Sequence, residues 1–230
     1  MNVIKVLAVL FVLISYVAAS STILVLDASG SMDDVVSGSA LKKIDVAKEA
    51  GNTFLNNVKS GDEVALIVFY DCNDIKTEVP FTTDLQQIRT KMASVMPDSN
   101  TPIAGSIVYA ANYATSSGRS GAGMIVLTDG EETCDYQSDA VAAAQNVTTS
   151  GPIKIINVVG FDISNSSSAQ QDLQEIATAG GGKYYSAQDA GQLASSLTQA
   201  YQSGSNGACC LPSLGLPALV GAAFFYSRKK

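Results

Sequence analysis

The chain has 230 residues, enough for one sizeable α/β domain once its two apolar ends are set aside. All 21 acidic residues lie between Asp27 and Asp189, whereas only ten of the 14 basic residues lie in that range. The net charge of residues 27–189 is therefore −11. This negative charge argues against nucleic acid as a partner, and the absence of histidine from the chain excludes a Ser–His–acid catalytic relay.

Residues 1–19 are typical of a secretory signal peptide. Lys5 gives a short positive start, residues 6–18 carry no charge, and the small residues at the end allow cleavage after Ala19 or Ser20. The apolar run is short for an ordinary membrane-spanning helix, and an uncleaved anchor is the alternative. The first predicted strand begins at Thr22, so a cleaved chain would begin practically inside the fold.

Strand and helix patterns alternate through residues 20–202, which we take as one domain. Near-continuous apolar runs indicate buried parallel strands, and a weaker run indicates an edge strand. We therefore predict a doubly wound α/β fold: a mostly parallel six-stranded sheet with helices on both faces and one antiparallel edge strand. The predicted strands are residues 22–26, 64–69, 75–80 (the edge), 124–127, 153–159 and 183–185. The predicted helices are residues 44–58, 102–114 with Thr101 as cap, 138–147 with Ser138 as cap, 168–179, and a last one through Leu193, Leu197 and Tyr201.

The C-terminal residues predict a tether. Residues 203–210 read as a flexible linker, residues 211–226 as a charge-free apolar segment, and residues 227–230 as a basic tail that favours a cytoplasmic end. A retained transmembrane anchor is one interpretation. The stretch 211–215 also resembles a cell-wall sorting signal, with Leu214 where threonine is expected, and Cys209 and Cys210 could carry lipid. Each alternative places the domain outside the membrane, at the cell surface.

Oxygen-bearing side chains follow the ends of two predicted strands. Asp27, Ser29 and Ser31 come directly after the first buried strand, Thr101 precedes a helix, and Asp129 follows the strand expected beside the first. Ligands of doubly wound sheets bind beyond the carboxyl ends of the strands, at the switch point. Oxygen ligands with few carboxylates suit a hard cation, Mg²⁺ above all, with Mn²⁺ or Ca²⁺ as alternatives.

The series Asp27-x-Ser29-x-Ser31, Thr101-Pro102 and Thr128-Asp129-Gly130 resembles the metal-ion-dependent adhesion site of von Willebrand factor type A domains. The resemblance covers roughly residues 22–202. It implies that Asp27, Ser29, Ser31, Thr101 and Asp129 are the metal ligands, and that an acidic side chain of a partner completes the coordination. The stretch from Asp129 to Cys134, with Cys72, particularly resembles secreted bacterial and archaeal members.

Other residues of this region have separate interpretations. The acidic side chains of Asp33, Asp34, Glu131, Glu132 and Asp135 are expected on the rim, as a solvated face or, as the alternative, a second cation site. Cys72 and Cys134 follow two strands at the same edge, and an exported chain meets oxidising conditions, so we expect a disulfide between them. Two Asn-x-Ser/Thr sequons, at Asn146 and Asn165, are consistent with export.

These observations lead to three competing hypotheses of function. The first is a tethered surface module that captures a protein ligand bearing an Asp or Glu through the cation. The second is an accessory or structural subunit that docks onto an envelope complex, such as a channel, pilus or surface layer, through the same site. The third, a metal-dependent hydrolase, lacks an identifiable base, so we expect a protein that is not an enzyme.

Overall fold

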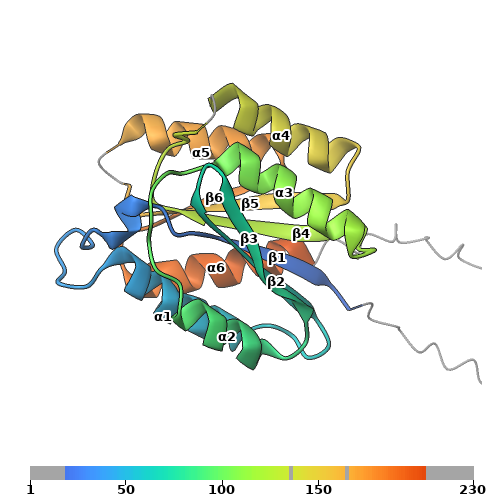
Figure 1. Ribbon diagram of the computed structural model, residues 1–230, viewed down its shortest axis with the longest axis horizontal. Helices are drawn as coiled ribbons and strands as arrows, with labels where there is room; N and C mark the ends of the chain where they lie inside the picture. The colour runs from blue at the N-terminus through green and yellow to red at the C-terminus, as the bar shows by residue number, and fades with distance from the viewer. Residues whose placement is uncertain (1–18, 135–136, 164–165, 206–230) are drawn as a thin grey trace, which may run out of the picture.

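The computed structural model describes residues 19–134, 137–163 and 166–205, whose strands and helices alternate along the chain (Figure 1). The strands are β1 Ser21–Asp27, β2 Glu63–Asp71, β3 Asp74–Thr82, β4 Ala122–Thr128, β5 Ile153–Phe161 and β6 Gly181–Ala187. The helices are α1 Lys43–Leu55, α2 Leu85–Ala93, α3 Ile103–Ser116, α4 Gln137–Thr149, α5 Ser167–Ala179 and α6 Ala190–Ser205, with a short 3₁₀ helix, η1, at Gly30–Asp33.

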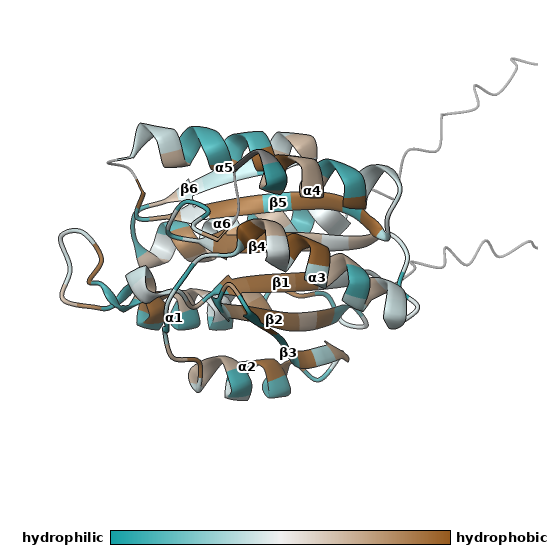
Figure 2. Ribbon diagram, turned by 45° about the horizontal axis from the view of Figure 1, so that its top comes forward, coloured by the Kyte–Doolittle hydropathy of each residue, from teal (hydrophilic) through white to brown (hydrophobic). Residues whose placement is uncertain are grey.

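The six strands form one sheet in the order β3-β2-β1-β4-β5-β6. β1 pairs in parallel with both β2 and β4, β5 pairs in parallel with β4 and β6, and only the edge strand β3 is antiparallel, to β2. The predicted fold class is therefore confirmed. In Figure 2 the central strands are the most hydrophobic part of the ribbon, as a sheet covered on both faces requires.

Successive residues of β1 point to opposite faces of the sheet and divide the core in two. Ile23 and Val25 pack on the side of α3, α4 and α5, whereas Leu24 and Leu26 pack on the side of α1, α2 and α6. The two helix layers lie above and below the sheet in Figure 1. All four side chains are at most 1 % exposed, so β1 is the centre of both halves of the core.

The sheet grows in opposite directions from β1. The chain passes from β1 to β2 and β3 on one side, and later adds β4, β5 and β6 on the other. The loops after β1 and β4 therefore leave the same edge in different directions, which creates the switch point where ligands of this architecture bind.

Several local predictions need correction. Helix α2 was not predicted, because only Ile88 and Met92 of its nine residues are buried and its amphipathic pattern is short. Helix α4 begins at Gln137, so Ser138 lies within the helix and does not precede it as a cap. Helix α6 continues to Ser205, so residues 203–205, predicted as linker, are helical.

The two predicted terminal segments are not part of the described structure. Residues 1–18, 206–230 and the sequon residue Asn165 lie outside the described ranges, and so does the rim residue Asp135. Among the residues that the structure describes, no helix has the length and apolar character needed to cross a membrane.

Candidate metal site

The loop after β1 is held tightly against the segment that precedes α3. Asp27 ends β1 and is fully buried. The carbonyl oxygen of Ala28 accepts a hydrogen bond from the Asp98 N–H at 2.8 Å, and the Gly30 N–H donates to the Ser99 carbonyl at 2.9 Å. A Cβ atom at Gly30 would lie 3.1 Å from the Asp98 carbonyl oxygen, so glycine permits this close approach.

Four of the predicted ligand residues are joined by hydrogen bonds. One carboxylate oxygen of Asp27 accepts from the Ser29 N–H at 2.7 Å and the other from the Thr128 hydroxyl at 2.6 Å. The Ser29 and Ser31 hydroxyl oxygens are 3.1 Å apart, and the Ser31 hydroxyl donates to Asp129 Oδ1 at 2.7 Å. Asp129 is 5 % exposed, so two nearly inaccessible carboxylates and two hydroxyls meet between β1 and β4.

Thr101, the fifth predicted ligand residue, lies in the segment next to this cluster. It is 4 % exposed and pairs with the loop after β4: its N–H donates to the Thr133 hydroxyl at 2.7 Å, and its carbonyl accepts from the Thr133 N–H at 3.0 Å. The backbone bond between Gly30 and Ser99 joins its segment to the loop after β1. Three loops from distant parts of the chain thus adjoin at the switch point.

Thr101 does not cap α3 as predicted. Pro102 occupies the cap position, and it has no side-chain group that could accept a hydrogen bond. Instead, Glu132 Oε2 accepts from the Ala104 N–H in the first turn at 2.7 Å, and Glu132 Oε1 accepts from the Cys134 N–H at 2.9 Å. A carboxylate from another loop therefore satisfies and charges the helix N-terminus.

A lysine that the sequence did not indicate completes the surroundings of Asp129. Lys43, the first residue of α1, places its Nζ 2.8 Å from Asp129 Oδ2. The side chain of Lys43 is 12 % exposed and that of Asp129 is not exposed. The ion pair therefore supplies a positive charge at the edge of the sheet where the predicted cation would bind.

The two buried carboxylates influence each other. Burial and the charge of Asp129 raise the pKa of Asp27 to about 7, although hydrogen bonds from Ser29 and Thr128 act in the opposite direction. Removing a carboxylate from water disfavours its ionised form, and a second negative charge nearby disfavours it further. Positive charge in this site would favour the ionised form of Asp27 and offset that cost.

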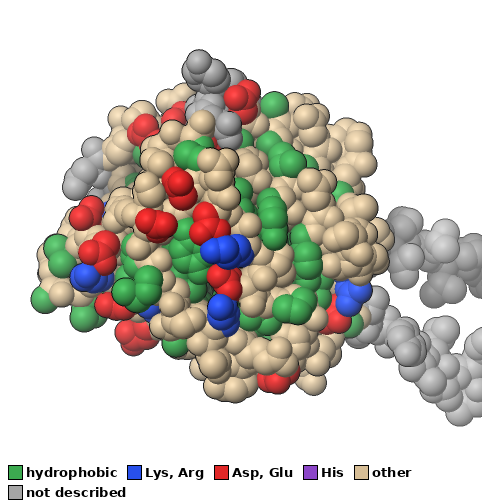
Figure 3. Space-filling view, viewed as in Figure 1, with side chains coloured by type: hydrophobic (Ala, Val, Ile, Leu, Met, Phe, Trp, Pro, Cys, Tyr) green, Lys and Arg blue, Asp and Glu red, His purple; other side chains and the backbone are tan. Residues whose placement is uncertain are grey.

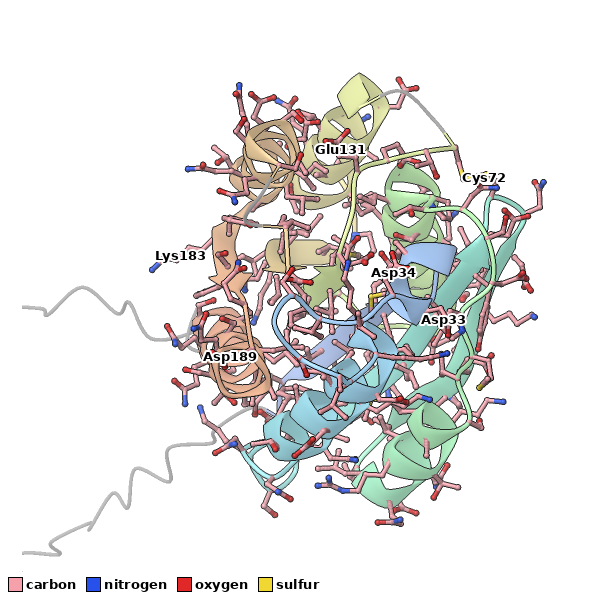
Figure 4. The ribbon with its side chains drawn as sticks, turned by 90° about the vertical axis from the view of Figure 1, so that its left-hand side faces the viewer. Asp33, Asp34, Cys72, Glu131, Lys183 and Asp189 are labelled. Atoms are coloured by element: carbon pink, nitrogen blue, oxygen red, sulfur yellow. A yellow bond between two sulfur atoms is a disulfide. The ribbon has the colours of Figure 1, made fainter. Side chains whose placement is uncertain are left out.

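The rim residues differ in what they contact. Asp33 pairs with Lys42 at 2.7 Å, and both side chains are about half exposed. Glu131 accepts from the Ser166 and Ser168 hydroxyls, at 3.1 and 2.9 Å, across to the start of α5. Asp34 is exposed, and Figure 4 shows Asp33 and Asp34 below Glu131 at this end of the molecule.

Acidic side chains gather over the same end in the space-filling view, where η1 and the loop that follows it lie (Figure 3). Within the described ranges, no three acidic, cysteine or histidine residues come together in a way that could hold a metal. Glu132 is a capping residue and not part of a free acidic face.

The predicted disulfide is present. Cys72 and Cys134 are bonded, with their α-carbons 5.5 Å apart, and the bond joins the turn after β2 to the loop after β4. Because β1 lies between β2 and β4, this bond passes over the end of β1. The sequon residue Asn146 is exposed on helix α4, rather than in a surface loop.

A pocket of about 390 Å³ is lined in part by Asp129. Its lining includes Glu131, Asp162, Ile163 and Ser166, from the loops after β4 and β5. Asp162 has a φ of 54°, a left-handed conformation that is uncommon outside glycine, and its Oδ2 accepts from the Ser37 N–H at 3.0 Å. The pocket leaves space beside Asp129, between the loops after β4 and β5.

Sequence reasoning missed two residues that touch the buried carboxylates, Thr128 and Lys43. Thr128 precedes Asp129 at the end of a strand, so it could have been found from its place in the motif. Lys43 lies 86 residues from Asp129 in the chain, and the neighbouring Lys42 has the same charge. No local pattern distinguishes the lysine that turns inward.

Comparison with known proteins places this chain among related sequences. Residues 22–132 match the von Willebrand factor type A domain family. YwmD of Bacillus subtilis, an uncharacterized protein, is 27 % identical over 192 residues, which cover 76 % of this chain and 82 % of that protein.

Solved structures with the same fold include a bacterial membrane protein and a bacterial minor pilin. An aerotolerance-related membrane protein of Bacteroides fragilis is 25 % identical, with a TM-score of 0.65 over 80 % of this chain and 100 % of that chain. The PilB minor pilin of Streptococcus sanguinis is 15 % identical, with a TM-score of 0.63 over 81 % of this chain and 62 % of that chain. At that identity the second likeness concerns the fold alone.

Proposed function

Since residues 22–132 match the von Willebrand factor type A domain family, we propose that this chain is a cell-surface binding module of that family that holds a divalent cation. Asp27, Ser29, Ser31, Thr101 and Asp129 hold the cation, Mg²⁺ in the first place. A protein partner is captured when one of its Asp or Glu side chains completes the coordination. The module binds and does not catalyse.

The hydrogen-bonded cluster of Asp27, Ser29, Ser31 and Asp129 is the observation that carries this proposal. Its donor set consists of oxygen atoms, which hard divalent cations prefer. Two buried carboxylates close together repel each other, so positive charge beside them is favourable. The Lys43 ammonium, 2.8 Å from Asp129 Oδ2, supports this interpretation because this site already accepts a cationic group.

The bound cation supplies an electrophilic position at which an incoming carboxylate can bind. The residues around it keep the oxygen atoms in place. The Thr128 hydroxyl and the Ser29 N–H fix the two oxygens of Asp27, and Thr133 fixes the backbone of Thr101. Such fixed ligands reduce the entropy that is lost when the cation and the partner bind.

Net charge determines which partner fits. The acidic rim, represented by Asp34 and Glu131, repels an acidic surface at short range, whereas the cation attracts a single carboxylate. The partner should therefore present one isolated Asp or Glu within a neutral or basic surface. Charge matching of this kind acts mainly on specificity and on the rate of encounter.

The proposed location at the envelope is supported by the predicted signal peptide and apolar C-terminal segment, and by the likeness to an aerotolerance-related membrane protein. The tether is the apolar segment 211–226, retained, processed or replaced by lipid. The likeness to an aerotolerance-related membrane protein favours one second candidate. In that candidate, the same site docks the domain onto a neighbouring envelope complex of the same cell.

Titration calorimetry with MgCl₂ and MnCl₂ tests the cation site directly. The native chain should bind one cation per molecule, and Asp27→Ala should abolish this binding while thermal unfolding in chelator shows that the variant is folded. Asp34→Ala, an exposed rim variant, is the matched control and should bind as the native chain does. Equal affinity of the native chain and Asp27→Ala would refute the site.

Capture of a partner from surface extract, with and without chelator, tests the second half of the proposal. A partner that is retained in magnesium and lost both in chelator and with Asp27→Ala supports the cation bridge. A partner that binds equally well in chelator contradicts it. Co-purification of the same partner from the cell's own membrane would favour the accessory-subunit candidate over capture of an external ligand.

A further inference from the structure

Both oxygens of the Asp129 carboxylate already have partners in the structure. Oδ1 accepts from the Ser31 hydroxyl at 2.7 Å, and Oδ2 lies 2.8 Å from Lys43 Nζ. The lysine is fixed at the first turn of α1, where its N–H donates to the Asp34 carbonyl at 2.8 Å. The ammonium is therefore held against the carboxylate of Asp129, which is also one of the proposed ligands of the cation.

The adjacent Lys42 shows how different this ion pair is from a surface pair. Lys42 contacts Asp33 at 2.7 Å, but the two side chains are 49 % and 56 % exposed, nine residues apart in the chain. The Lys43 pair joins α1 to the loop after β4, and its side chains are 12 % and 0 % exposed. Water screens the first pair and largely leaves the second unscreened.

We infer that Lys43 is a built-in counter-ion that competes with the divalent cation for Asp129 and so lowers the affinity of the site for metal. The inference rests on the proposed function, because it requires the cation to bind beside Asp129. An arriving cation either displaces the ammonium from Oδ2 or remains next to it. Displacement breaks a nearly buried ion pair, and coexistence brings two positive charges close together.

The same residue stabilises the domain without metal. A buried carboxylate without a positive partner carries a large desolvation cost, which the ammonium offsets. With Lys43 present, the free energy of unfolding of the metal-free form should therefore be closer to that of the metal-bound form than it would be without this charge. It also makes the loaded site net positive, since two carboxylates are balanced against three positive charges, and this favours a carboxylate as the completing ligand.

Calorimetric titration of the full-length chain with MgCl₂ at pH 7.5 compares the native protein with Lys43→Met, Lys43→Arg and Lys42→Met. Lys43→Met removes the charge with little change in length, and should bind Mg²⁺ about tenfold more tightly. Lys43→Arg keeps the charge, and Lys42→Met alters only the exposed pair, so both should bind close to the native affinity. Lys43→Gln replaces Lys43→Met if the methionine variant does not fold.

Thermal unfolding in chelator and in MgCl₂ provides an independent measurement. Lys43→Met should unfold at a lower temperature than the native protein in chelator, and MgCl₂ should raise its midpoint by more than it raises that of the native protein. If Lys43→Met binds Mg²⁺ as the native protein does, Lys43 only stabilises the fold and the inference is wrong. If neither protein binds Mg²⁺ or Mn²⁺, the proposed function itself is refuted.

Discussion

Replacing Glu132 with alanine should destabilise the start of α3 and, through it, the segment that carries Thr101. The variant loses the acceptor of the Ala104 N–H, 2.7 Å away, and that of the Cys134 N–H, 2.9 Å away. A lost helix cap costs about 1 kcal/mol, with a range of about 0.5–2 kcal/mol. The second bond adds about 1 kcal/mol, since its donor lies in a partly buried loop.

The expected total of about 2 kcal/mol corresponds to a fall of about 4–8 °C in the thermal midpoint of a domain of this size. Thermal unfolding in chelator, with the disulfide intact, measures it. The matched control is Glu131→Ala, whose carboxylate accepts hydrogen bonds from the Ser166 and Ser168 hydroxyls at the surface. This variant should change stability by less than about 0.5 kcal/mol. Equal losses for the two variants would show that Glu132 is an ordinary rim residue and refute the capping role.

Two more predictions concern stability. Burial raises the pKa of Asp62, but hydrogen bonds from Ser20 and Tyr201 outweigh this effect and hold the pKa below its usual value. A carboxylate whose pKa is lowered by folding stabilises the protein above its unfolded pKa, which is about 4. That stability is lost as the pH falls through the folded pKa. Asp62→Asn should therefore be less stable than the native protein by about 1–2 kcal/mol at pH 7, and this difference should disappear once the pH has fallen below the folded pKa of Asp62. Denaturant titrations at several pH values measure it, and a constant difference at all pH values would contradict the prediction. Reduction of the Cys72–Cys134 bond, which closes a loop with a sequence separation of 62, should lower the free energy of unfolding by roughly 4 kcal/mol, and an unchanged denaturation midpoint on reduction would contradict it.

The centre of the sheet was predictable from sequence because most residues of its four central strands, β1, β2, β4 and β5, are buried. Strand β1, for example, is a run of apolar residues from Ile23 to Leu26 that ends at a single carboxylate. A pattern of this kind depends on adjacent residues, so it can be read locally. Helix α2 has no such pattern, because only two of its nine residues, Ile88 and Met92, are buried.

The candidate ligand residues were also predictable, since each follows or precedes a regular element whose direction the α/β alternation fixes. Their partners were not. Glu131 and Glu132 are adjacent and carry the same charge. Glu131 nevertheless accepts hydrogen bonds from serines at the start of α5, whereas Glu132 caps α3. Electrostatic tests of the rim should therefore neutralise Asp34 and Glu131, and leave Glu132 unchanged.

The position of α6 has a mechanical consequence for an anchored protein. The candidate site follows the carboxyl ends of β1 and β4, whereas the end of α6 lies beside the beginning of β5, where a Cβ atom on Gly204 would be 3.7 Å from Ile155. A pull between a captured partner and a C-terminal anchor would therefore run along the strands. Such a load shears neighbouring parallel strands, so that all the hydrogen bonds between two strands resist together, whereas a load across the strands would open them one after another.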